Sequence, residues 1–486
     1  MPPLTRPPIP QYLTLPSRQA MVAAETDVLV VGGGPAGLGA ALGAATAGAD
    51  VVLAERYGFL GGNATAALVT LWSSDRTQRQ LTTLPGATTF FPTDHGPGEQ
   101  VFTGWPDRLV QRLVREGGAV APSLMTGYTV PFDPEIFKSV AQDMLDEAGV
   151  RLLLHSFASG VWSKEGTETL GGVAFESKSG PLVVRARCVV DCTGDGDVAA
   201  LAGASFEVGR KEDGLAQPMT LMFRMGEFER AAFEAYAKTH PGQWRGVHGL
   251  WELIEQAARA GDLDLPREDI LFFGTPHERE LLINSTRVVN VRATDVFDLT
   301  RAEMEGRRQV RMLAAFFQRY VPGFERGYLL QSAPCIGVRE GRRIVGEYQL
   351  TSEDILSARK FPDAIARGTY PIDIHNPTGK GTILKRLPAG ESYDIPLRCL
   401  VPAGVDNLLV AGRCISGTHV AHSSYRVMPI AMATGHAAGA CAALAAKRLK
   451  SPRFVPAGDV QAELARQGAG LDVINTVSRR KTTLIR

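Results

Sequence analysis

Residues 27–55 read DVLVVGGGPAGLGAALGAATAGADVVLAE, and this stretch decides the fold class. An apolar Val/Leu run ends in three glycines, an Ala/Gly-rich segment follows, and a second apolar run ends at Glu55. This order predicts a strand, a tight glycine turn, a helix and a second strand. We therefore expect an α/β protein.

The glycine turn satisfies G-x-G-x-x-G and opens the predicted helix. Its first glycine permits the tight turn, its second lets the backbone approach a pyrophosphate, and its third lets helix and strand pack closely. The helix N-terminus offers N–H groups and a positive dipole to phosphates. An acidic residue at the end of the next strand would accept hydrogen bonds from ribose hydroxyls. Because the strand, the glycine turn, the helix and the acidic residue occur together, a glycine turn that binds no ligand is disfavoured. The predicted dinucleotide site comprises Gly32, Gly34, Pro35, Ala36, Gly37 and Glu55.

The overall composition is that of an ordinary globular protein. The chain has 486 residues, of which 44% are hydrophobic and 21% charged, so disorder as the main state is excluded. Its length suggests roughly three compact units at about 150 residues each. The 52 Lys and Arg nearly balance the 51 Asp and Glu, leaving a net charge of +1. We therefore expect neither nucleic acid nor an anionic membrane as a partner.

Two uncharged stretches, 28–49 and 427–446, reach the length of a membrane span. Both consist mainly of Gly and Ala rather than Leu, Ile and Phe, so we expect neither to cross a membrane. The proline-rich N-terminus has no apolar signal-peptide core, and a cytoplasmic location is expected. The six cysteines form no C-x-x-C pair, so no metal site or redox dithiol is predicted.

Two other segments contain residues typical of helix ends. In 132–149, Asp133 is a plausible N-cap, Pro134 occupies the first helical position, and Gly149 ends the segment. Thr300 and Glu303 have the spacing of a capping box before a second long helix. Further strand-and-glycine-turn patterns occur at 181–197, ending DCTGDGD, and at 405–414, VDNLLVAGRC.

Several segments together identify a family resemblance. GGGPAG at 32–37, AERYGFLGGNAT at 54–65, DCTGDGD at 191–197, and NLLVAGRCISGTHVAHSSYRVMPIAMATGHAAG at 407–439 resemble the FAD-dependent oxidoreductase family. This family is a branch of the flavoprotein group that includes fumarate reductase flavoprotein subunits. The resemblance covers about 25–225 and 330–447. It implies FAD as the cofactor and a Rossmann-like FAD-binding domain interrupted by a second, α+β substrate or cap domain.

The resemblance also assigns roles around FAD. The 61–65 loop would wrap the pyrophosphate and flavin edge, Ala158 would meet the adenine through its backbone, and the turn at 193–195 would lie over the cofactor. Gly412 is followed by Arg where many relatives have Asp on the ribityl chain, so this Arg would instead face a phosphate. The helix from about Met428 would point its N-terminus at the flavin. The additional cofactor-binding residues are Arg56, Gly61, Gly62, Asn63, Thr65, Ala158, Thr193, Gly194, Asp195, Gly412, Arg413 and Met428.

Two features missing from the motifs predict how FAD is attached and whether NAD(P)H has a domain of its own. Relatives that tether FAD covalently often carry a His in the small-residue loop, and FLGGNATAAL at 59–68 has none. We expect non-covalent FAD. No second G-x-G-x-x-G follows another strand, so no separate NAD(P)H domain is expected.

The predicted domain organisation has five parts. Residues 1–24 form an N-terminal arm, 25–215 the first part of the FAD-binding domain with an excursion at 73–118, and 216–395 the substrate or cap domain. Residues 396–450 complete the FAD-binding domain, and 451–486 form a C-terminal tail. The sequence does not predict the oligomeric state.

Four side chains are candidates for catalysis or substrate binding: His419, His375, Arg339 and Tyr425. His419 lies between a glycine turn and the flavin-facing helix, and His375 lies in a polar YPIDIHNPTG loop. Either could transfer a proton, and either could be structural. Arg339, within IGVREGRRIVGEY, could bind a carboxylate or pair with a nearby Glu. Tyr425 and the adjacent Arg426 could contact substrate or flavin, or pack in the core. A metal pair of His419 and His422 is disfavoured without a third ligand.

The sequence favours an FAD-dependent enzyme that moves a hydride between a small polar organic substrate and flavin N5. A dehydrogenase or oxidase of a metabolite or natural-product intermediate is the first expectation. The alternative enzymatic function is that of a reductase of an activated C=C bond. A non-catalytic electron-relay subunit is the alternative of another class, disfavoured by the size of the middle domain.

Overall fold

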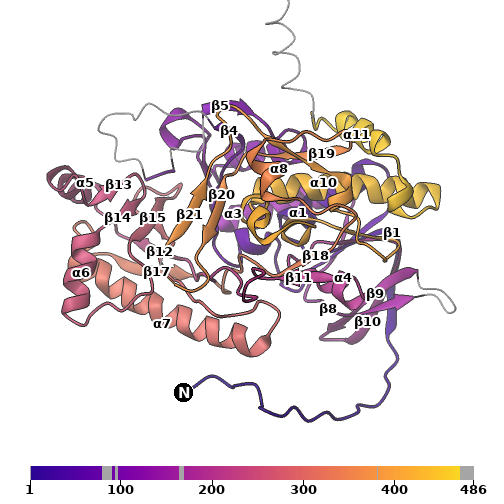
Figure 1. Ribbon diagram of the computed structural model, residues 1–486, viewed down its shortest axis with the longest axis horizontal. Helices are drawn as coiled ribbons and strands as arrows, with labels where there is room; N and C mark the ends of the chain where they lie inside the picture. Colours follow the sequence, from indigo (N-terminus) through magenta and orange to yellow (C-terminus); the bar gives the residue numbers. More distant parts are fainter. Residues whose placement is uncertain (1, 79–89, 93–96, 164–168, 380, 471–486) are drawn as a thin grey trace, which may run out of the picture.

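One large sheet organises the α/β fold of the computed structural model, which describes residues 2–78, 90–92, 97–163, 169–379 and 381–470 (Figure 1). Its strand order is β7-β2-β1-β10-β9-β8, with β23 paired to β10. Strands β7, β2, β1, β10 and β23 run parallel, whereas β9 is antiparallel to both β10 and β8. The bounds are β1 Met21–Val31, β2 Val51–Ala54, β7 Arg151–Leu153, β8 Phe157–Ser163, β9 Leu170–Ser177, β10 Gly180–Asp191 and β23 Leu408–Val410.

The strand–turn–helix–strand prediction for residues 27–55 is confirmed. Strand β1 is buried from Val28 to Val31 and pairs with β2 on one side and β10 on the other. Helix α1, Pro35–Thr46, begins directly after the glycine turn. Strand β1 starts at Met21, inside the segment predicted as an arm, because Met21 pairs with Leu182 of β10. The predicted fold class, an α/β Rossmann-like arrangement with a second sheet beside it, is also confirmed.

Helices α1 and α10, Met428–Arg448, pack backbone against backbone on this sheet. A Cβ on Gly435 would lie 1.9 Å from the Ala36 carbonyl oxygen, and a Cβ on Gly439 would lie 1.9 Å from that of Ala40. The uncharged Gly- and Ala-rich stretches at 28–49 and 427–446 therefore allow these two helices to pack closely. Helix α10 is long and apolar enough to cross a membrane, but 89% of its most apolar window is buried inside the protein, as in a core helix.

We expect Gly439→Ala to destabilise the protein by about 1–3 kcal/mol, because the added methyl group forces the two helices apart. Thermal unfolding would show this as a lowered Tm. Gly458→Ala is the matched control, since a Cβ there meets nothing within 4 Å and alanine favours a helix. An unchanged Tm for Gly439→Ala would contradict the packing argument.

A second sheet has the strand order β13-β14-β15-β16-β12-β17 and its own hydrophobic core. Its strands are β12 Phe223–Gly226, β13 Trp244–Arg245, β14 His248–Gly249, β15 Ile270–Gly274, β16 Leu281–Ile283 and β17 Tyr328–Ser332. Helices α5 Arg230–Thr239, α6 Trp251–Arg259 and α7 Val296–Tyr320 accompany it, and Figure 1 shows α7 running along its lower side.

The predicted capping box at Thr300 and Glu303 is wrong. Helix α7 begins one turn earlier, where the Asp295 carboxylate accepts hydrogen bonds from the N–H groups of Phe297 and Asp298. Thr300 lies within the helix and donates to the Val296 carbonyl. The prediction at Asp133 is confirmed, since its carboxylate caps helix α3, Pro134–Glu147.

The remaining elements connect the two sheets and cover the edges of the first. The helices are α2 Trp105–Arg115, α4 Asp197–Leu201, α8 Ser352–Leu356, α9 His419–Tyr425 and α11 Ala457–Arg466. The short strands are β3 Leu71–Trp72, β4 Arg76–Gln78, β5 Pro97–Gln100, β6 Val130–Pro131, β11 Phe206–Val208, β18 Arg342–Ile344, β19 Ala364–Gly368, β20 Ile372–His375, β21 Thr382–Lys385 and β22 Tyr393–Pro396.

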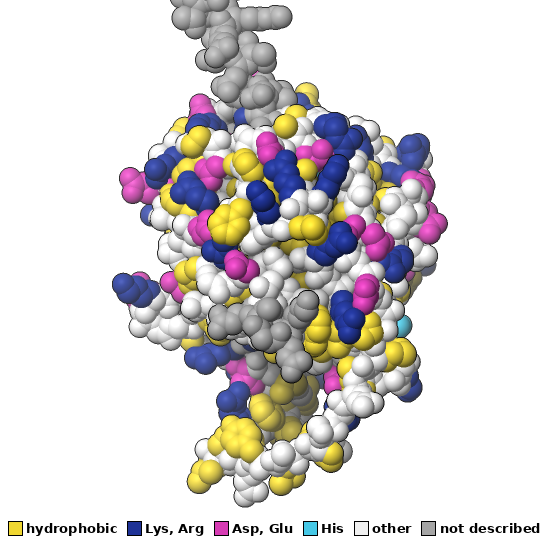
Figure 2. Space-filling model, turned by 90° about the vertical axis from the view of Figure 1, so that its right-hand side faces the viewer, with side chains coloured by type: hydrophobic (Ala, Val, Ile, Leu, Met, Phe, Trp, Pro, Cys, Tyr) yellow, Lys and Arg dark blue, Asp and Glu magenta, His cyan; other side chains and the backbone are white. Residues whose placement is uncertain are grey.

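The buried side chains group somewhat differently from the predicted domains. The second core ends at Val338, and hydrophobic residues from Ile344 onward pack with the first sheet. Part of the excursion at 73–118 and the end of the predicted tail at 451–486 lie outside the described residues. The domain boundaries themselves stay a prediction. On the face that Figure 2 shows, basic and acidic side chains are intermixed, in keeping with the balanced charge.

The predicted tail contains helix α11, which packs against α10. Just after it, the Gln467 side chain donates to the Gly43 carbonyl of α1 and lies 2.7 Å from His436 Nε2 of α10. Burial lowers the pKa of His436 to about 4. His436 is therefore neutral in the folded protein at pH values where the unfolded chain begins to bind a proton.

A pH-dependent stability follows from this difference. Because the folded-state pKa of His436 lies below the usual 6.5, its contribution to stability is complete above pH 6.5 and is lost as the pH falls toward 4. The loss is about 1.4 kcal/mol per pH unit. Chemical denaturation of the wild type and His436→Gln between pH 4 and 7 measures it. Parallel stability curves for the two proteins would contradict the prediction.

Candidate functional site

A cavity of about 590 Å³ lies between the carboxyl ends of the first sheet's parallel strands and the second sheet. One wall contains the turns after β1, β10 and β23 and the N-terminus of α10. This is where open α/β sheets bind their ligands. The opposite wall contains side chains of β14–β16 and β20–β21. The cavity therefore joins the predicted cofactor site to a surface from the middle of the chain.

The glycines of the first turn fit a bound pyrophosphate. Gly32 has φ +102°, and a Cβ there would lie 2.4 Å from the Cys192 carbonyl oxygen; a Cβ on Gly37 would lie 1.8 Å from that of Gly32. These two glycines are required by the protein's own packing. Gly34 differs, because its Cβ would meet only Gly62, at 3.6 Å. Helix α1 has no side-chain cap, so its first N–H groups are available to phosphate oxygens.

Glu55 lines the cavity directly after β2. Its side chain is 5% exposed, and its two carboxylate oxygens accept hydrogen bonds from the N–H groups of Gly33 and Tyr57. Burial raises the pKa of Glu55, and these two N–H groups act against that rise. Each carboxylate oxygen has a further lone pair, so Glu55 has the capacity to accept hydrogen bonds from a ligand hydroxyl.

Arg413 and Asp195 face each other across the cavity wall. Arg413 Nη1 lies 3.2 Å from Asp195 Oδ1, but both atoms are buried without an aligned hydrogen bond among the described residues. Buried polar atoms of this kind normally have partners. The pair therefore fits a site completed by a polar ligand, and the dinucleotide predicted at the adjacent turns would supply one.

The structure brings most of the predicted site residues to this cavity. Those lining it are Gly32, Gly34, Pro35, Ala36, Glu55, Arg56, Gly62, Asn63, Thr193, Gly194, Asp195, Arg339, His375, Gly412, Arg413 and Met428. The other predicted residues, Gly37, Gly61, Thr65, Ala158, His419 and Tyr425, do not line it. Gly61 and Thr65 shape the neighbouring loop, since Gly61 N donates to the Gly33 carbonyl and Thr65 Oγ1 donates to the Leu60 carbonyl. Ala158 lies on β8.

His419 and Tyr425 are held in the protein interior at the two ends of α9. His419 is 9% exposed, and its Nδ1 lies 2.9 Å from Glu340 Oε1. The Tyr425 hydroxyl donates to the Ile415 carbonyl at 3.0 Å. Burial lowers the pKa of the intervening His422 well below its usual value. Within the described ranges, no His, Cys, Asp and Glu group could hold a metal ion.

His375 does reach the cavity, from the end of β20. Its Nδ1 lies 3.2 Å from Arg287 Nη2, and its Nε2 lies 3.5 Å from Asp373 Oδ2. Because Arg287 can only donate, Nδ1 accepts and Nε2 carries the proton. Burial and the nearby Arg339 lower the pKa of His375 to about 3. The imidazole is therefore neutral near pH 7.

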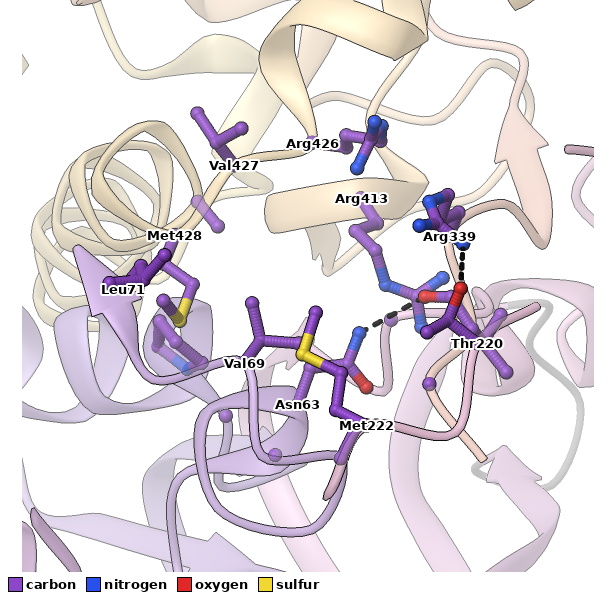
Figure 3. Close-up of a pocket in the computed structure, with 18 of the residues that line it drawn as sticks. Asn63, Val69, Leu71, Thr220, Met222, Arg339, Arg413, Arg426, Val427 and Met428 are labelled. Atoms are coloured by element: carbon purple, nitrogen blue, oxygen red, sulfur yellow. Dashed lines mark hydrogen bonds between the residues drawn. The ribbon is translucent and has the colours of Figure 1, made fainter. Parts of the chain in front are cut away.

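Arg339 lines the same cavity (Figure 3), and its charge acts on His375. Its Nη1 donates to the Pro218 carbonyl at 2.8 Å and to Thr220 Oγ1 at 2.6 Å. Burial, followed by repulsion from the Arg426 guanidinium, lowers the pKa of Arg339 to about 9. The IGVREGRRIVGEY segment contains two further arginines with other partners. Arg342 pairs with Asp197, and Arg343 pairs with Glu340.

A third group in the cavity was not predicted from the sequence. His248 of β14 lies with its Nδ1 2.9 Å from Asp269 Oδ2, and Arg267 Nε lies 2.9 Å from Asp269 Oδ1. Although burial opposes ionisation of Asp269, the hydrogen bond from His248 and the charge of Arg267 lower its pKa to about 2. His248 thus has a permanent carboxylate partner. Only the pairing of β14 with β15 brings these residues together, and no sequence motif marks them.

The chain was compared with protein families, solved structures and curated proteins. A family model described as FAD dependent oxidoreductase matches residues 27–464. Among solved structures, a geranylgeranyl bacteriochlorophyll reductase-like protein from Thermoplasma acidophilum has 14% identity and a TM-score of 0.45, covering 95% of this chain and 88% of that one. The p-nitrophenol 4-monooxygenase of Pseudomonas putida DLL-E4 has 12% identity and a TM-score of 0.45, covering 90% and 84%. A comparison with curated proteins finds no match.

Proposed function

The chain belongs to the FAD dependent oxidoreductase family, and we propose that it moves a hydride between a small polar organic substrate and the flavin. Both would bind in the cavity described above. The observation that carries the proposal is the continuity of this cavity. It extends from the glycine turn at Gly34 to the polar side chains of His375 and Arg339. One ligand-binding space would thus hold both the dinucleotide and a polar substrate.

The residues that would hold FAD come from separate segments of the chain. The N-terminus of α1 would bind the pyrophosphate, and Glu55 would bind the ribose. Asn63, whose Nδ2 is fixed by the Val338 carbonyl at 3.0 Å, and the N-terminus of α10 would border the flavin. FAD would supply hydride acceptance or donation at N5. The α10 dipole favours negative charge at this position.

His375 is our candidate for the proton-transfer group. It is the one of the two predicted histidines that lines the cavity, whereas the His419 ring is held by Glu340. Neutral His375 would carry its proton on Nε2, beside the Asp373 carboxylate. Asp373 would orient the ring, and Arg287 would fix the tautomer from the other side. His248, with its Asp269 partner, is the alternative group in the same cavity.

The direction of the reaction is the part of the proposal that experiment decides most directly. We favour a dehydrogenase or oxidase; a reductase of an activated C=C bond is the second candidate. Photoreduced, FAD-loaded protein would be mixed with oxygen or with crotonate in a stopped-flow spectrometer. Rapid reoxidation by oxygen would support an oxidase, and reoxidation by crotonate alone would support the reductase. Reoxidation only by protein or dye acceptors, with no organic substrate able to bleach the flavin, would instead support an electron relay.

Non-covalent binding of FAD has its own test. The loop at 59–68, which would border the flavin, contains no His. We expect trichloroacetic acid to precipitate a colourless protein and to release all the flavin into the supernatant. Absorbance of the two fractions at 450 nm measures the partition. Yellow colour retained in a washed pellet would show a covalent bond.

A further inference from the structure

Positive charge exceeds negative charge in the substrate half of the cavity. Arg267, Arg339 and Arg426 line it, and Arg287 lies directly behind His375. The buried or half-buried carboxylates there are Asp269 and Asp373. The charge of Glu268 also acts on Arg287. Glu268 is exposed, however, so solvent screens its charge. His375 is neutral and adds nothing to the balance.

Both carboxylates already have cationic partners or hydrogen-bond donors. Asp269 accepts from Arg267 Nε at 2.9 Å and lies 2.9 Å from His248 Nδ1. Asp373 accepts from the Tyr370 hydroxyl at 2.9 Å and lies 3.3 Å from Arg426 Nη2. Neither has an oxygen within ion-pair distance of Arg339 among the described residues. The excess charge is therefore concentrated at one side chain.

Among the described residues, Arg339 has no carboxylate within ion-pair distance, although the charge of Asp373 acts on it from further away. Its Nη1 is used by the Pro218 carbonyl and Thr220 Oγ1, and within the described part of the chain its Nε and Nη2 have no partner. The Arg426 Nε atom is also buried without a partner in that part. Arg339 is half-buried, and a charge withdrawn from bulk water in this way is normally paired. Burial and mutual repulsion lower the pKa of Arg339 to about 9 and that of Arg287 to about 10, which shows the cost of this arrangement.

FAD would not neutralise these groups, because its phosphates would have cations of their own. Arg56 and Arg413 lie at the glycine-turn end of the cavity, beside Asp195. Figure 3 shows Arg339 and Arg426 together on one side of the cavity, with Leu71 and Met428 on the other. An anion bound between the two arginines would thus have an apolar surface facing the rest of its body.

We propose that the substrate is an organic acid with one carboxylate and a mainly apolar body, and that the carboxylate binds between Arg339 and Arg426. This inference rests on the proposed function, since it names the substrate class of that same cavity. A planar carboxylate matches the paired donors of a guanidinium. The free Nε and Nη2 of Arg339 supply such a pair, and the unpartnered Nε of Arg426 supplies a further donor. The apolar body would contact Leu71, Met222 and Val69, which also line the cavity.

Equilibrium dialysis of FAD-loaded protein against labelled ligands tests this proposal without requiring turnover. Benzoate is the carboxylate probe, benzamide its neutral counterpart of nearly equal shape, and phenyl phosphate the dianionic comparison. We expect benzoate to bind at least 10-fold more tightly than benzamide and more tightly than phenyl phosphate. We expect Arg339→Gln and Arg426→Gln each to weaken benzoate binding by about 10- to 100-fold, the range for a hydrogen bond to a charged group. Benzamide binding should change little.

Arg292→Gln is the matched control. Arg292 is exposed and lies on the same segment as Arg287, so its replacement removes one nearby positive charge without touching the cavity. Equal loss of benzoate in this variant would overturn the proposal, because it would indicate a general charge effect. Equal binding of benzoate and benzamide, or tighter binding of phenyl phosphate, would also overturn it.

The outcome is separable from that of the proposed function. FAD content, read from the flavin absorbance of every variant before dialysis, tests the cofactor site independently. Protein that retains FAD and whose flavin is bleached by a neutral organic substrate, but that does not select benzoate, would refute the carboxylate inference alone. Protein that selects benzoate through Arg339 and Arg426, but whose flavin no organic substrate reduces, would refute the hydride-transfer function alone.

Discussion

Gly34→Ala is expected to give a folded protein that loses most of its FAD. The new Cβ would lie 3.6 Å from the nearest protein atom, Gly62 Cα, which is an ordinary van der Waals contact. Gly34 has φ −75°, a value that alanine adopts without strain. The methyl group would instead occupy the space through which the backbone approaches the pyrophosphate. We expect the Kd for FAD to rise by at least about 100-fold, or about 2.7 kcal/mol.

The measurement is a fluorescence titration of apo-protein with FAD, with circular dichroism of the same sample to check the fold. Gly458→Ala is the control, because a Cβ there meets no other atom within 4 Å and the residue is remote from the cavity. Gly37→Ala is not a usable comparison, since its Cβ would lie 1.8 Å from the Gly32 carbonyl oxygen and would disturb the turn itself. FAD affinity unchanged in folded Gly34→Ala would show that the cofactor does not lie against this turn.

His375→Gln is expected to slow flavin reduction by about 10²- to 10⁴-fold, the usual contribution of a positioned proton-transfer group. FAD content should be unaffected, because His375 lies at the substrate side of the cavity. The measurement is anaerobic stopped-flow reduction by a substrate that bleaches the wild-type flavin. The lost rate should appear in the limiting rate constant rather than in substrate affinity, because glutamine preserves a polar side chain but cannot transfer the proton.

Two further variants sharpen this result. His240→Gln replaces an exposed histidine at the end of α5 and should behave as the wild type. His419→Gln removes one of the partners of the buried Glu340 and should lower stability while leaving the limiting rate of reduction within about tenfold of the wild-type value. If His419→Gln slowed reduction as strongly as His375→Gln, or if His375→Gln reduced flavin at the wild-type rate, the assignment of His375 would be wrong.

Features encoded in a short stretch of residues were predictable. The first turn needs Gly37 because a Cβ there would meet the Gly32 carbonyl, and this contact follows from the strand–turn–helix order alone. The cap at Asp133 likewise depends on adjacent residues. The cap of α7 was misassigned because two overlapping signals compete there. Asp295 precedes Thr300, and its carboxylate captures the first free N–H groups of the helix.

Features that depend on pairing between distant segments were not predictable. His419 follows a glycine turn, which suggested proximity to the flavin, but its ring turns toward Glu340 and away from the cavity. His248 reaches the cavity only because β14 pairs with β15, where Asp269 and Arg267 precede the strand. Neither the direction of a ring nor the pairing of two short strands is visible in a single sequence.

The segments that would bind FAD are widely separated along the chain, from Gly34 at one end to Met428 at the other. A ligand that contacts all of them binds only the folded state, so its binding free energy adds to the free energy of unfolding. At a free FAD concentration 100 times Kd, this addition is about 2.7 kcal/mol, a considerable share of the stability of an ordinary domain. The abundance of this protein in a cell would therefore follow the supply of flavin, because a shortage of flavin would leave more of the chain unfolded and open to proteolysis.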